Sequence, residues 1–534
     1  MFGKAGNRVS GSVLEKIEEH RSPGLNEQAD NQDEVLAFLS NPATHGGEKV
    51  QRIDTHAASV FLAGERALKI KRAVRFPFLD YSTLGKRKEA CEAELAVNAP
   101  YAPEIYRAVV AITREADGKL AIAGRGTPVE WAVEMRRFDE KRTLDHLAGE
   151  IDEMLADALG RAVAEARARA QPVEAAPWIA AIGSYIGEHA AAFRRHPEFF
   201  ARVEVDTLER LGRTAYEHIL PLLRDRGRRG LICRIHGDLH LGNIVLIDGK
   251  PVLFDAIEFS EIIASGDVLY DLAFLLMDLL ERGLPLPASI VFNRYLAQTH
   301  RAEDLDGLAA LPFFLSLRAS IRAMVTAARM ERAAEARRDA IAKSARAYFA
   351  FAQRAIAPPA PKLIAIGGLS GTGKTRLARM LAPHIGPMPG AVILRSDVER
   401  KALFGVSETD KLPGEAYTAD VTERVYASLL DKARRTLAAG HSALVDAVFA
   451  QAEERAALVT MADAAKLALR GLFLTADLKT RLARIGGRAG DASDAGEKVV
   501  RAQESYDLGA LDWTQIDASG TPEETLSRAL AALD

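Results

Sequence analysis

A buried strand that runs into a glycine-rich loop and then into a helix is the feature that most restricts the fold of this chain. Leu363 to Ile366 is a short apolar run of the kind found in parallel sheets, and the loop from Gly368 to Gly373 follows it. A helical pattern begins again at Arg376. Because parallel strands need crossover helices, this order predicts an α/β domain with a doubly wound parallel sheet.

Further apolar runs supply the other strands of that sheet. We expect them at Val392 to Arg395, Ser442 to Val445, Gly471 to Leu474 and Trp513 to Ile516. Asp397 and Asp446 follow two of these strands. Ligands of such sheets bind at the carboxyl ends of the strands, so both carboxylates are expected beside the glycine-rich loop.

The loop matches the pattern G-x-x-x-x-G-K-[ST], in which backbone N–H groups surround phosphate at a helix N-terminus. Lys374 would reach the β- and γ-phosphates and the Thr375 hydroxyl would bind Mg²⁺, so ATP and Mg²⁺ are the expected cofactors. The alternative is a glycine-rich turn without a ligand. The residues expected at the nucleotide are Gly368, Ser370, Gly371, Thr372, Gly373, Lys374 and Thr375.

Three prolines, Pro358, Pro359 and Pro361, end a long helical pattern just before this strand. Proline cannot continue a helix, so a short and stiff linker is expected here. A chain of 534 residues is also too long for a single core. We therefore place the boundary between an N-terminal domain, residues 1–356, and a C-terminal domain, residues 357–534.

A β-hairpin is predicted in the N-terminal domain by two apolar runs, Ile244 to Ile247 and Val252 to Phe254, on either side of Asp248-Gly249. An Asp-Gly pair between apolar runs is a strong signal for a two-residue turn. Folding about this turn brings Asn243 and Asp255 together at the open end of the hairpin, beside Asp238.

These three side chains suit phosphoryl transfer. The amide oxygen of Asn243 and the carboxylate of Asp255 can hold Mg²⁺ beside phosphates, and Asp238 can accept the proton of an attacking hydroxyl. The spacing from Asp238 to Asn243 equals that of the protein-kinase catalytic loop, H-R-D-x-x-x-x-N, with His-Gly-Asp in place of His-Arg-Asp. The alternative is an ordinary polar loop followed by a hairpin.

The run His236 to Asn243, together with "LFDAIEF" downstream, resembles the aminoglycoside phosphotransferase-like kinases, which phosphorylate hydroxyl groups of small molecules. The resemblance implies a bilobal, protein-kinase-like domain of the α+β class. The strand-like runs Lys49 to His56, Ser59 to Leu62 and Ala67 to Lys71 match its opening sheet. The turn Thr55 to Ser59 lies where protein kinases carry a glycine-rich flap, yet it contains no glycine; a serine or a backbone N–H could still touch phosphate there.

Ala-Leu-Lys69 resembles the A-x-K of the third kinase strand, whose lysine binds the α- and β-phosphates. Lys71 lies on the same face by the period of two, so both stay open, and we prefer Lys69. The family pairs this lysine with a carboxylate on the helix predicted from Leu84 to Asn98. Glu94 in "CEAELAVN" is the candidate, with Glu92 and Glu89 as alternatives.

Two other segments of the N-terminal domain have expected roles. The end of the strand "EWAVEMRRF", at Glu134 to Arg136, is the expected hinge where backbone groups meet adenine. Asp267 is expected to cap the apolar helix that follows it, and Asp271 to be a buried organiser of the catalytic loop. Residues before about Asn31 are expected to form a loose arm or a short helix.

The C-terminal domain resembles small P-loop kinases of the gluconate-kinase and zeta-toxin-like group. In that group the aspartate after the second strand activates the acceptor hydroxyl and a nearby arginine binds the acceptor, which implies these roles for Asp397 and Arg400 in "RSDVERK". The alternative for Asp397 is a helix N-cap. Asp446 in "ALVDAVF" resembles the carboxylate that lies near Mg²⁺.

The segment "RLARIGGRAGDASDA" resembles the lid of these kinases, whose arginines neutralise the transferring phosphate. The resemblance implies catalytic roles for Arg484 and Arg488, with Arg481 as a further candidate. A lid of this kind favours a kinase over a motor ATPase.

Composition narrows the possible partners. A formal net charge of -3 gives no case for nucleic-acid binding through bulk charge. The two cysteines, Cys91 and Cys233, are far apart and are expected to be reduced thiols of a cytoplasmic protein. The N-terminus lacks the apolar run of a signal peptide, and the run Leu269 to Leu280 is too short to span a bilayer. We expect small-molecule partners, neither nucleic acid nor membrane, and leave the oligomeric state open.

The sequence therefore predicts a tandem ATP-dependent phosphotransferase with two separate Mg·ATP sites and small-molecule hydroxyl acceptors. One alternative is a single catalytic domain regulated by the other as an ATP sensor, and the absent glycine-rich flap would make the N-terminal half the weaker catalyst. Another is a nucleotide-gated interaction protein without catalysis. The carboxylates Asp238 and Asp397 argue against it, because binding alone needs no proton acceptor.

Overall fold

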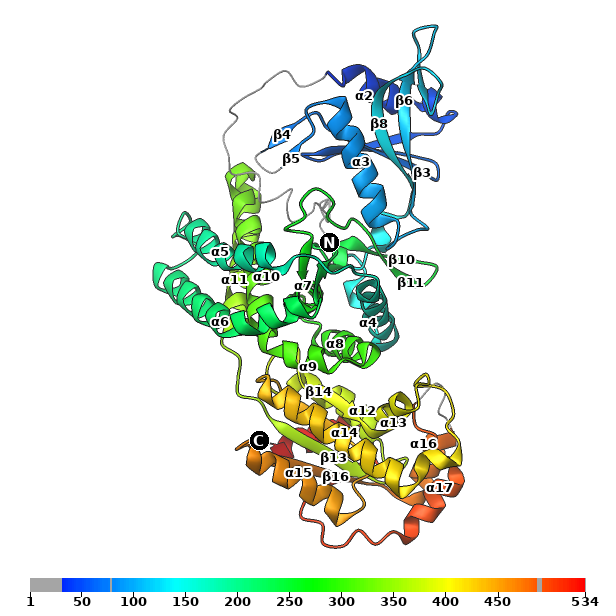
Figure 1. Ribbon diagram of the computed structural model, residues 1–534, viewed down its shortest axis with the longest axis vertical. Helices are drawn as coiled ribbons and strands as arrows, with labels where there is room; N and C mark the ends of the chain where they lie inside the picture. The colour runs from blue at the N-terminus through cyan, green and yellow to red at the C-terminus, as the bar shows by residue number, and fades with distance from the viewer. Residues whose placement is uncertain (1–30, 77–78, 487–491, 534) are drawn as a thin grey trace. The chain divides into compact units, whose positions relative to one another are not determined.

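The computed structural model describes residues 31–76, 79–486 and 492–533. By its contacts the chain divides into unit 1, Met1–Arg282 with Phe314–Gln353, and unit 2, Gly283–Phe313 with Arg354–Asp534. The predicted N-terminal arm lies outside the described residues. The boundary at 356/357 stays a prediction, and each unit is described by itself below, with the labels of Figure 1.

The first part of unit 1 is a six-stranded sheet in the order β1-β2-β3-β8-β6-β7, and all of its strand pairs are antiparallel. Helix α3 (Leu84–Asn98) packs against strand β8 and begins where the Thr83 side chain accepts a hydrogen bond from the Lys86 N–H. The strands are β1 (Val50–Asp54), β2 (Ala58–Ala63), β3 (Arg66–Lys71), β6 (Tyr106–Arg114), β7 (Leu120–Ile122) and β8 (Thr127–Arg136), preceded by α2 (Asp33–Ser40), while β4 (Arg75–Phe76) and β5 (Leu79–Asp80) form a separate pair.

The second part of unit 1 is mostly helical. Short strands β9 (Ile232–Arg234) and β12 (Ser265–Asp267) pair beside the catalytic loop. Asp267 caps helix α7 by accepting the Leu269 N–H, which confirms the predicted N-cap. The helices of this part are α4 (Glu153–Ala168), α5 (Ala175–Phe193), α6 (Arg202–Arg228), α7 (Val268–Glu281), α10 (Leu311–Ala328) and α11 (Glu335–Ile356).

The predicted hairpin is confirmed as β10 (Ile244–Ile247) and β11 (Lys250–Leu253). Asp248 and Gly249 both adopt positive φ, 50° and 76°, as a two-residue turn of this kind requires. At the open end the Phe254 N–H donates to the Asn243 carbonyl over 3.0 Å. This register places Asn243 directly beside Asp255.

Unit 2 contains a five-stranded parallel sheet in the order β14-β15-β13-β16-β17, which confirms the doubly wound α/β prediction. Its strands are β13 (Leu363–Gly368), β14 (Val392–Arg395), β15 (Ala443–Asp446), β16 (Leu469–Thr475) and β17 (Thr514–Asp517). Its helices are α8 (Pro285–Thr299), α9 (Ala302–Gly307), α12 (Lys374–Leu381), α13 (Ser396–Leu403), α14 (Ala419–Ala438), α15 (Ala452–Ala464), α16 (Leu478–Gly486), α17 (Glu497–Ala502) and α18 (Pro522–Leu533).

Helix α8 covers the edge strand β14, although it precedes the predicted domain boundary. The Asn293 side chain accepts the Ile393 N–H over 2.7 Å and donates to the Ala391 carbonyl over 3.2 Å. An edge strand otherwise leaves such groups unpaired, and here one amide side chain satisfies two of them. Arg294 also pairs with Glu408 at 2.8 Å, so α8 holds both the strand that leads to Asp397 and a segment beyond it.

Within the described residues, the stretch Ala302–Ala328 is apolar and long enough to cross a membrane by length and composition. In the structure 78% of its most apolar window is buried, as in a core helix of a soluble protein.

His441 makes a pH-dependent contribution to unit 2. Its ring is buried 5.4 Å from Phe292, its Nε2 contacts the Gly390 carbonyl, and burial lowers its pKa to about 4. Unfolding returns the pKa to its ordinary value near 6.5, so the unfolded chain binds the extra proton and stability falls as pH drops through this window. We expect this residue to lower the free energy of unfolding by about 2 kcal/mol between pH 7 and pH 5. Urea unfolding at both pH values tests this, and a His441→Gln variant with an unchanged pH dependence would contradict it.

Candidate active sites

The candidate catalytic loop of unit 1, His236 to Asn243, is held in place by side chains that bind its backbone groups. Asp271, in the first turn of α7, accepts the N–H groups of His236 at 2.7 Å and Gly237 at 3.0 Å. Arg318 donates to the Gly237 carbonyl at 2.9 Å. Gly237 has φ +81°, which an L side chain rarely adopts. Asp271 is therefore the buried organiser of the loop, as the sequence predicts.

His236 ties this loop to the hairpin. Its Nε2 contacts the Phe254 carbonyl at 3.0 Å, and its Nδ1 accepts the Asp238 N–H at 3.4 Å. Burial lowers the pKa of His236, although Asp271 and Asp238 oppose that effect. A neutral ring with its proton on Nε2 satisfies both contacts.

Asp238 and Asn243 form the centre of the site. The Asn243 Nδ2 donates to the Asp238 carbonyl at 2.9 Å and to its Oδ2 at 3.0 Å, and the Asp238 side chain is fully buried. The Nε2 of His240 lies 3.5 Å from the same carboxylate. The amide oxygen of Asn243 takes no part in these bonds, which is the arrangement a metal ligand needs.

Asp255 adopts a left-handed backbone conformation with φ 61°, which costs a non-glycine residue about 1–3 kcal/mol. Its N–H donates to the Tyr106 hydroxyl at 3.2 Å. Asn98, the last residue of α3, binds both backbone groups of Ala256, accepting at 2.6 Å and donating at 3.1 Å. Sequence reasoning missed Asn98 and Tyr106, since neither belongs to a motif.

The two candidate lysines have different surroundings. Lys69 lies 2.8 Å from Glu94 and 3.1 Å from Asp255, and 19% of its side chain is exposed. Lys71 lies 2.6 Å from Glu94 and also pairs with Glu258, with only 3% exposed. Although burial alone lowers the pKa of each lysine, these carboxylates raise both well above their ordinary value. The environment of Lys69 favours it as the phosphate ligand, while Lys71 is enclosed.

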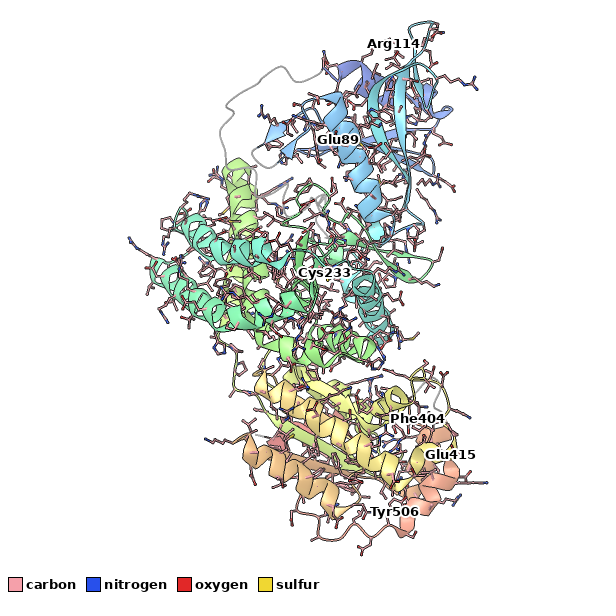
Figure 2. All side chains as sticks on the ribbon, viewed as in Figure 1. Glu89, Arg114, Cys233, Phe404, Glu415 and Tyr506 are labelled. Atoms are coloured by element: carbon pink, nitrogen blue, oxygen red, sulfur yellow. The ribbon has the colours of Figure 1, made fainter. Side chains whose placement is uncertain are left out.

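Glu94 is the helix carboxylate that reaches these lysines. It is fully buried, and despite that burial Lys69 and Lys71 lower its pKa. Of the two alternatives, Glu92 is exposed and lies 3.6 Å from Lys88, and Glu89 is also exposed on α3 (Figure 2).

The turn at Thr55 to Ser59 does not offer its serine hydroxyl to a phosphate. Ser59 is fully buried and donates to Asp54 at 2.7 Å, and the Ala58 N–H donates to the Thr55 hydroxyl. At the expected hinge, Arg136 lines a cavity of about 390 Å³ together with Phe138 and the turn of the hairpin at Asp248.

In unit 2 the glycine-rich loop has the backbone that its motif requires. Gly368, Gly371 and Gly373 have φ values of +138°, +86° and +95°, which only glycine adopts readily. The Thr375 hydroxyl donates to Asp446 Oδ2 at 2.7 Å at the start of α12. These two oxygens come from the helix and from the end of β15, as the sequence predicts.

Asp397 lies inside the first turn of α13, whose N-cap is Arg395. The alternative that Asp397 caps this helix is therefore wrong. Arg400, on the same helix, donates to the Ala416 carbonyl at 2.6 Å and lies over the Tyr417 ring, 5.0 Å from its centroid. Arg395 also lies 3.7 Å from Asp446.

The arginines of the predicted lid bind backbone carbonyls. Arg481 donates to the Ser370 carbonyl at 2.9 Å. Arg484 donates to the carbonyls of Thr372 at 3.1 Å and Ala518 at 2.7 Å. Arg488 lies outside the described residues. The catalytic roles of Arg484 and Arg488 stay predictions.

Both sites have the donors that Mg²⁺ prefers. Within the described residues, no cluster of three His, Cys, Asp or Glu side chains could hold a metal ion alone. Mg²⁺ bound with a nucleotide instead takes one or two protein oxygens and completes its shell with phosphate and water. Asn243 with Asp255, and Thr375 with Asp446, are pairs of this kind.

Two family models match this chain. One described as "Phosphotransferase enzyme family" matches residues 56–311, and one described as "AAA domain" matches residues 363–506. Uncharacterized proteins of Mycobacterium tuberculosis and Mycobacterium bovis are 29% identical over 491 residues, which is 89% of this chain and 94% of each relative.

Three solved structures each resemble a share of this chain. A choline/ethanolamine kinase family protein from Mesorhizobium loti is 14% identical, covers 61% of this chain and 98% of its own, and gives a TM-score of 0.37. The ADP-bound aminoglycoside phosphotransferase APH(2'')-Ib is 13% identical, with coverages of 61% and 99% and a TM-score of 0.32. A gluconokinase from Sinorhizobium meliloti 1021 is 20% identical, with coverages of 33% and 93% and a TM-score of 0.25.

Substitution of the two lysines of β3 is expected to have different effects, on nucleotide affinity for Lys69 and on stability for Lys71. Lys69→Met should lower the affinity of unit 1 for Mg·ATP at least tenfold and leave the protein folded, because Lys71 still neutralises Glu94. Lys71→Met should destabilise unit 1 by about 3–5 kcal/mol, since Glu94 and Glu258 lose the buried ammonium that they share. Calorimetry with Mg·ATP and thermal unfolding of both variants make the comparison. The reverse pattern would assign phosphate binding to Lys71.

Proposed function

We propose that this chain is a tandem ATP-dependent phosphotransferase, a proposal supported by the match of residues 56–311 to the phosphotransferase family model and of residues 363–506 to the AAA domain model. Two separate Mg·ATP sites would each transfer phosphate to a small-molecule hydroxyl. The observation that carries this proposal is the buried Asp238, bound by Asn243 beside Asp255. This set combines a proton acceptor with metal-binding oxygens.

In the N-terminal site, Lys69 would bind the phosphates of ATP, and its ion pair with Glu94 fixes the ammonium in place. Asn243 and Asp255 would hold Mg²⁺, which neutralises charge on the phosphates. Asp238 would accept the proton of the attacking hydroxyl, a role that typically contributes about 10²–10⁴ in rate. The network around His236 and Asp271 keeps this carboxylate in place.

In the C-terminal site, the backbone N–H groups of the glycine-rich loop and Lys374 would bind the phosphates. Thr375 and Asp446 would hold Mg²⁺, as their 2.7 Å contact supports. Asp397 would accept the proton of the acceptor, with Arg400 on the same helix as an acceptor ligand. Arg484 and Arg488 would act on the transferring phosphate.

The alternative proposal is that one domain catalyses while the other senses ATP. The turn at Thr55 to Ser59 gives it some support. Residues Thr55 to Ser59 lack glycine, and the Ser59 hydroxyl is taken by Asp54. The N-terminal site would then bind ATP weakly. A sensor has no use for a buried proton acceptor, however, and Asp238 therefore favours catalysis.

The acceptor of the N-terminal site is proposed only as a small molecule with a hydroxyl group, such as a sugar, amino alcohol, aminoglycoside or nucleotide sugar. Two acidic residues at α4, which could otherwise bind a cationic amino sugar, are bound within the chain. Asp152 caps α4 at the Leu155 N–H, and Asp157 pairs with Arg161 at 2.8 Å. A screen of metabolites for acceptor-dependent ADP release identifies the acceptor, with Asp238→Asn and Asp397→Asn chains assigning each activity to its site.

We propose that the protein works in the cytoplasm. Both cysteines, Cys91 and Cys233, are buried free thiols. Burial raises the pKa of Cys91 to about 12, so its thiol stays protonated and unreactive. Buried reduced thiols suit a reducing compartment.

Asp238→Asn is expected to lower N-terminal phosphate transfer by about 10²–10⁴ and to leave Mg·ATP binding nearly unchanged. The reason is that Asp238 is the proposed proton acceptor and is not one of the two proposed metal ligands. Turnover with an identified acceptor and calorimetry with Mg·ATP are measured together. Loss of Mg·ATP binding would place Asp238 among the metal ligands.

Lys374→Ala is expected to abolish nucleotide binding by the C-terminal site while the N-terminal site still binds. Its ammonium is the cation that the loop provides for the β- and γ-phosphates. Calorimetry of the intact protein with Mg·ADP should resolve two binding events, and the variant should keep one. A single event in the unaltered protein would refute the two-site proposal.

A further inference from the structure

In unit 2, side chains from α16 and from the segment after α17 bind the backbone of the glycine-rich loop. The peptide bond is planar and trans, so a contact that fixes a carbonyl also fixes the direction of the next N–H on the same peptide unit. Arg481 donates from Nε to the Ser370 carbonyl at 2.9 Å. This contact sets the plane of the Ser370–Gly371 peptide and directs the Gly371 N–H to the opposite side.

Gln503 fixes the preceding peptide. Its Oε1 accepts the Ser370 N–H at 2.7 Å, and the carbonyl of that same peptide, at Leu369, accepts from the Thr372 hydroxyl at 2.8 Å and from Lys374 Nζ at 3.3 Å. Both ends of the Leu369–Ser370 peptide therefore have partners. One of them, Gln503, lies 133 residues away in the sequence.

A third contact follows the same rule. Arg484 donates from Nη1 to the Thr372 carbonyl at 3.1 Å, which orients the peptide that carries the Gly373 N–H. The N–H groups of Gly371 and Gly373 belong to the set that surrounds phosphate in this motif. Three contacts from α16 and the segment after α17 therefore hold the loop: Arg481 and Arg484 orient the peptides of the Gly371 and Gly373 N–H groups, and Gln503 holds the peptide before them.

The supporting side chains are themselves fixed. Arg481 is 2% exposed and Gln503 is 5% exposed. Arg481 also pairs with Glu504 and donates to the Val500 carbonyl, so it ties α16 to the segment that holds Gln503. A Cβ on Gly371 would lie 2.7 Å from the Arg481 carbonyl oxygen, so the loop backbone is packed directly on α16.

We propose that Gln503, together with Arg481, is a positioning residue for the nucleotide phosphates: it acts through the Ser370 peptide and holds the glycine-rich loop in its binding conformation. The ligand is the diphosphate or triphosphate group of a nucleotide. The proposal rests on the proposed nucleotide site of unit 2 and adds residues to it that no motif contains. Without Gln503 the buried Ser370 N–H has no acceptor, so the peptide turns away and binding must restore it.

The test uses the full chain and Mg·ADP, whose binding needs no acceptor molecule. The event that belongs to unit 2 is the one that Lys374→Ala removes. Gln503→Leu keeps the volume and removes the oxygen, and we expect the dissociation constant of this event to rise about tenfold or more. Gln503→Glu keeps an oxygen for the Ser370 N–H and should stay within about threefold of the unaltered protein.

Arg501→Leu is the matched control, because Arg501 is exposed two residues before Gln503 and pairs with Glu497. It should leave the dissociation constant unchanged. Gln503→Asn, which draws the oxygen back by one methylene, repeats the test with a polar side chain if the leucine variant does not fold. Thermal unfolding of each variant separates lost stability from lost affinity.

An unchanged dissociation constant in Gln503→Leu or Gln503→Asn, with or without a lower melting temperature, overturns the proposal and gives Gln503 a purely structural role. Failure of Gln503→Glu to restore binding also overturns it, because the acceptor oxygen would then not be the cause. If the unaltered protein shows no Mg·ADP event that depends on Lys374, the nucleotide site of unit 2 is wrong, and the proposed function and this inference both fall.

Discussion

The buried carboxylate of Glu94 is the interaction on which the N-terminal site depends. It lies 2.8 Å from Lys69 and 2.6 Å from Lys71, and those lysines in turn meet Asp255 and Glu258. Buried charges are tolerated only when each has partners, so the loss of Lys71, which pairs with both Glu94 and Glu258, is expected to be costly. The network joins strand β3, helix α3 and the segment that carries Asp255, the proposed metal ligand. It thereby sets the ammonium of Lys69, the proposed phosphate ligand, at a fixed place relative to Asp255.

The two units differ in the groups that they offer for the proposed binding of phosphate. Unit 1 offers side chains: Lys69 for phosphate, and Asn243 with Asp255 for Mg²⁺. Its turn at Thr55 to Ser59 is closed by its own hydrogen bonds. Unit 2 offers backbone N–H groups, whose direction is a property of the peptide planes. Substitutions would therefore disturb the two proposed sites in different ways. In unit 1 a broken ion pair would move a side chain, and in unit 2 a rotated peptide would redirect an N–H group.

The residues that sequence could predict are those whose position follows from local rules. The Asp248-Gly249 turn fixes its own register, and this register alone brings Asn243 beside Asp255. A period of two places Lys69 and Lys71 on one face, but it cannot separate them, because the difference lies in their partners. Only the tertiary fold, which brings the segment after β11 to β3, shows that Lys71 meets Glu258.

Other residues carried no local signal. Asn98 ends a helix and reads as an ordinary terminal residue, yet its amide binds both backbone groups of Ala256. Gln503 lies in a segment without a motif and contacts Ser370 only through the tertiary fold. Both side chains hold the backbone beside a residue of a proposed site. Asn98 does so next to Asp255, and Gln503 next to Gly371. Motifs identify the groups that touch a ligand, while the groups that orient them are specified by long-range packing.

The burial of Asp238 bears on whether unit 1 is only a nucleotide sensor. Binding a nucleotide requires phosphate-binding groups and metal-binding oxygens, and each unit has candidates for these roles. It does not require a proton acceptor. Asp238 is completely buried and bound by Asn243, and burying a carboxylate is costly unless hydrogen bonds offset the lost hydration. The chain maintains that carboxylate with Asn243, His236 and the Asp271-bound loop, and this arrangement supports the proton transfer proposed for Asp238.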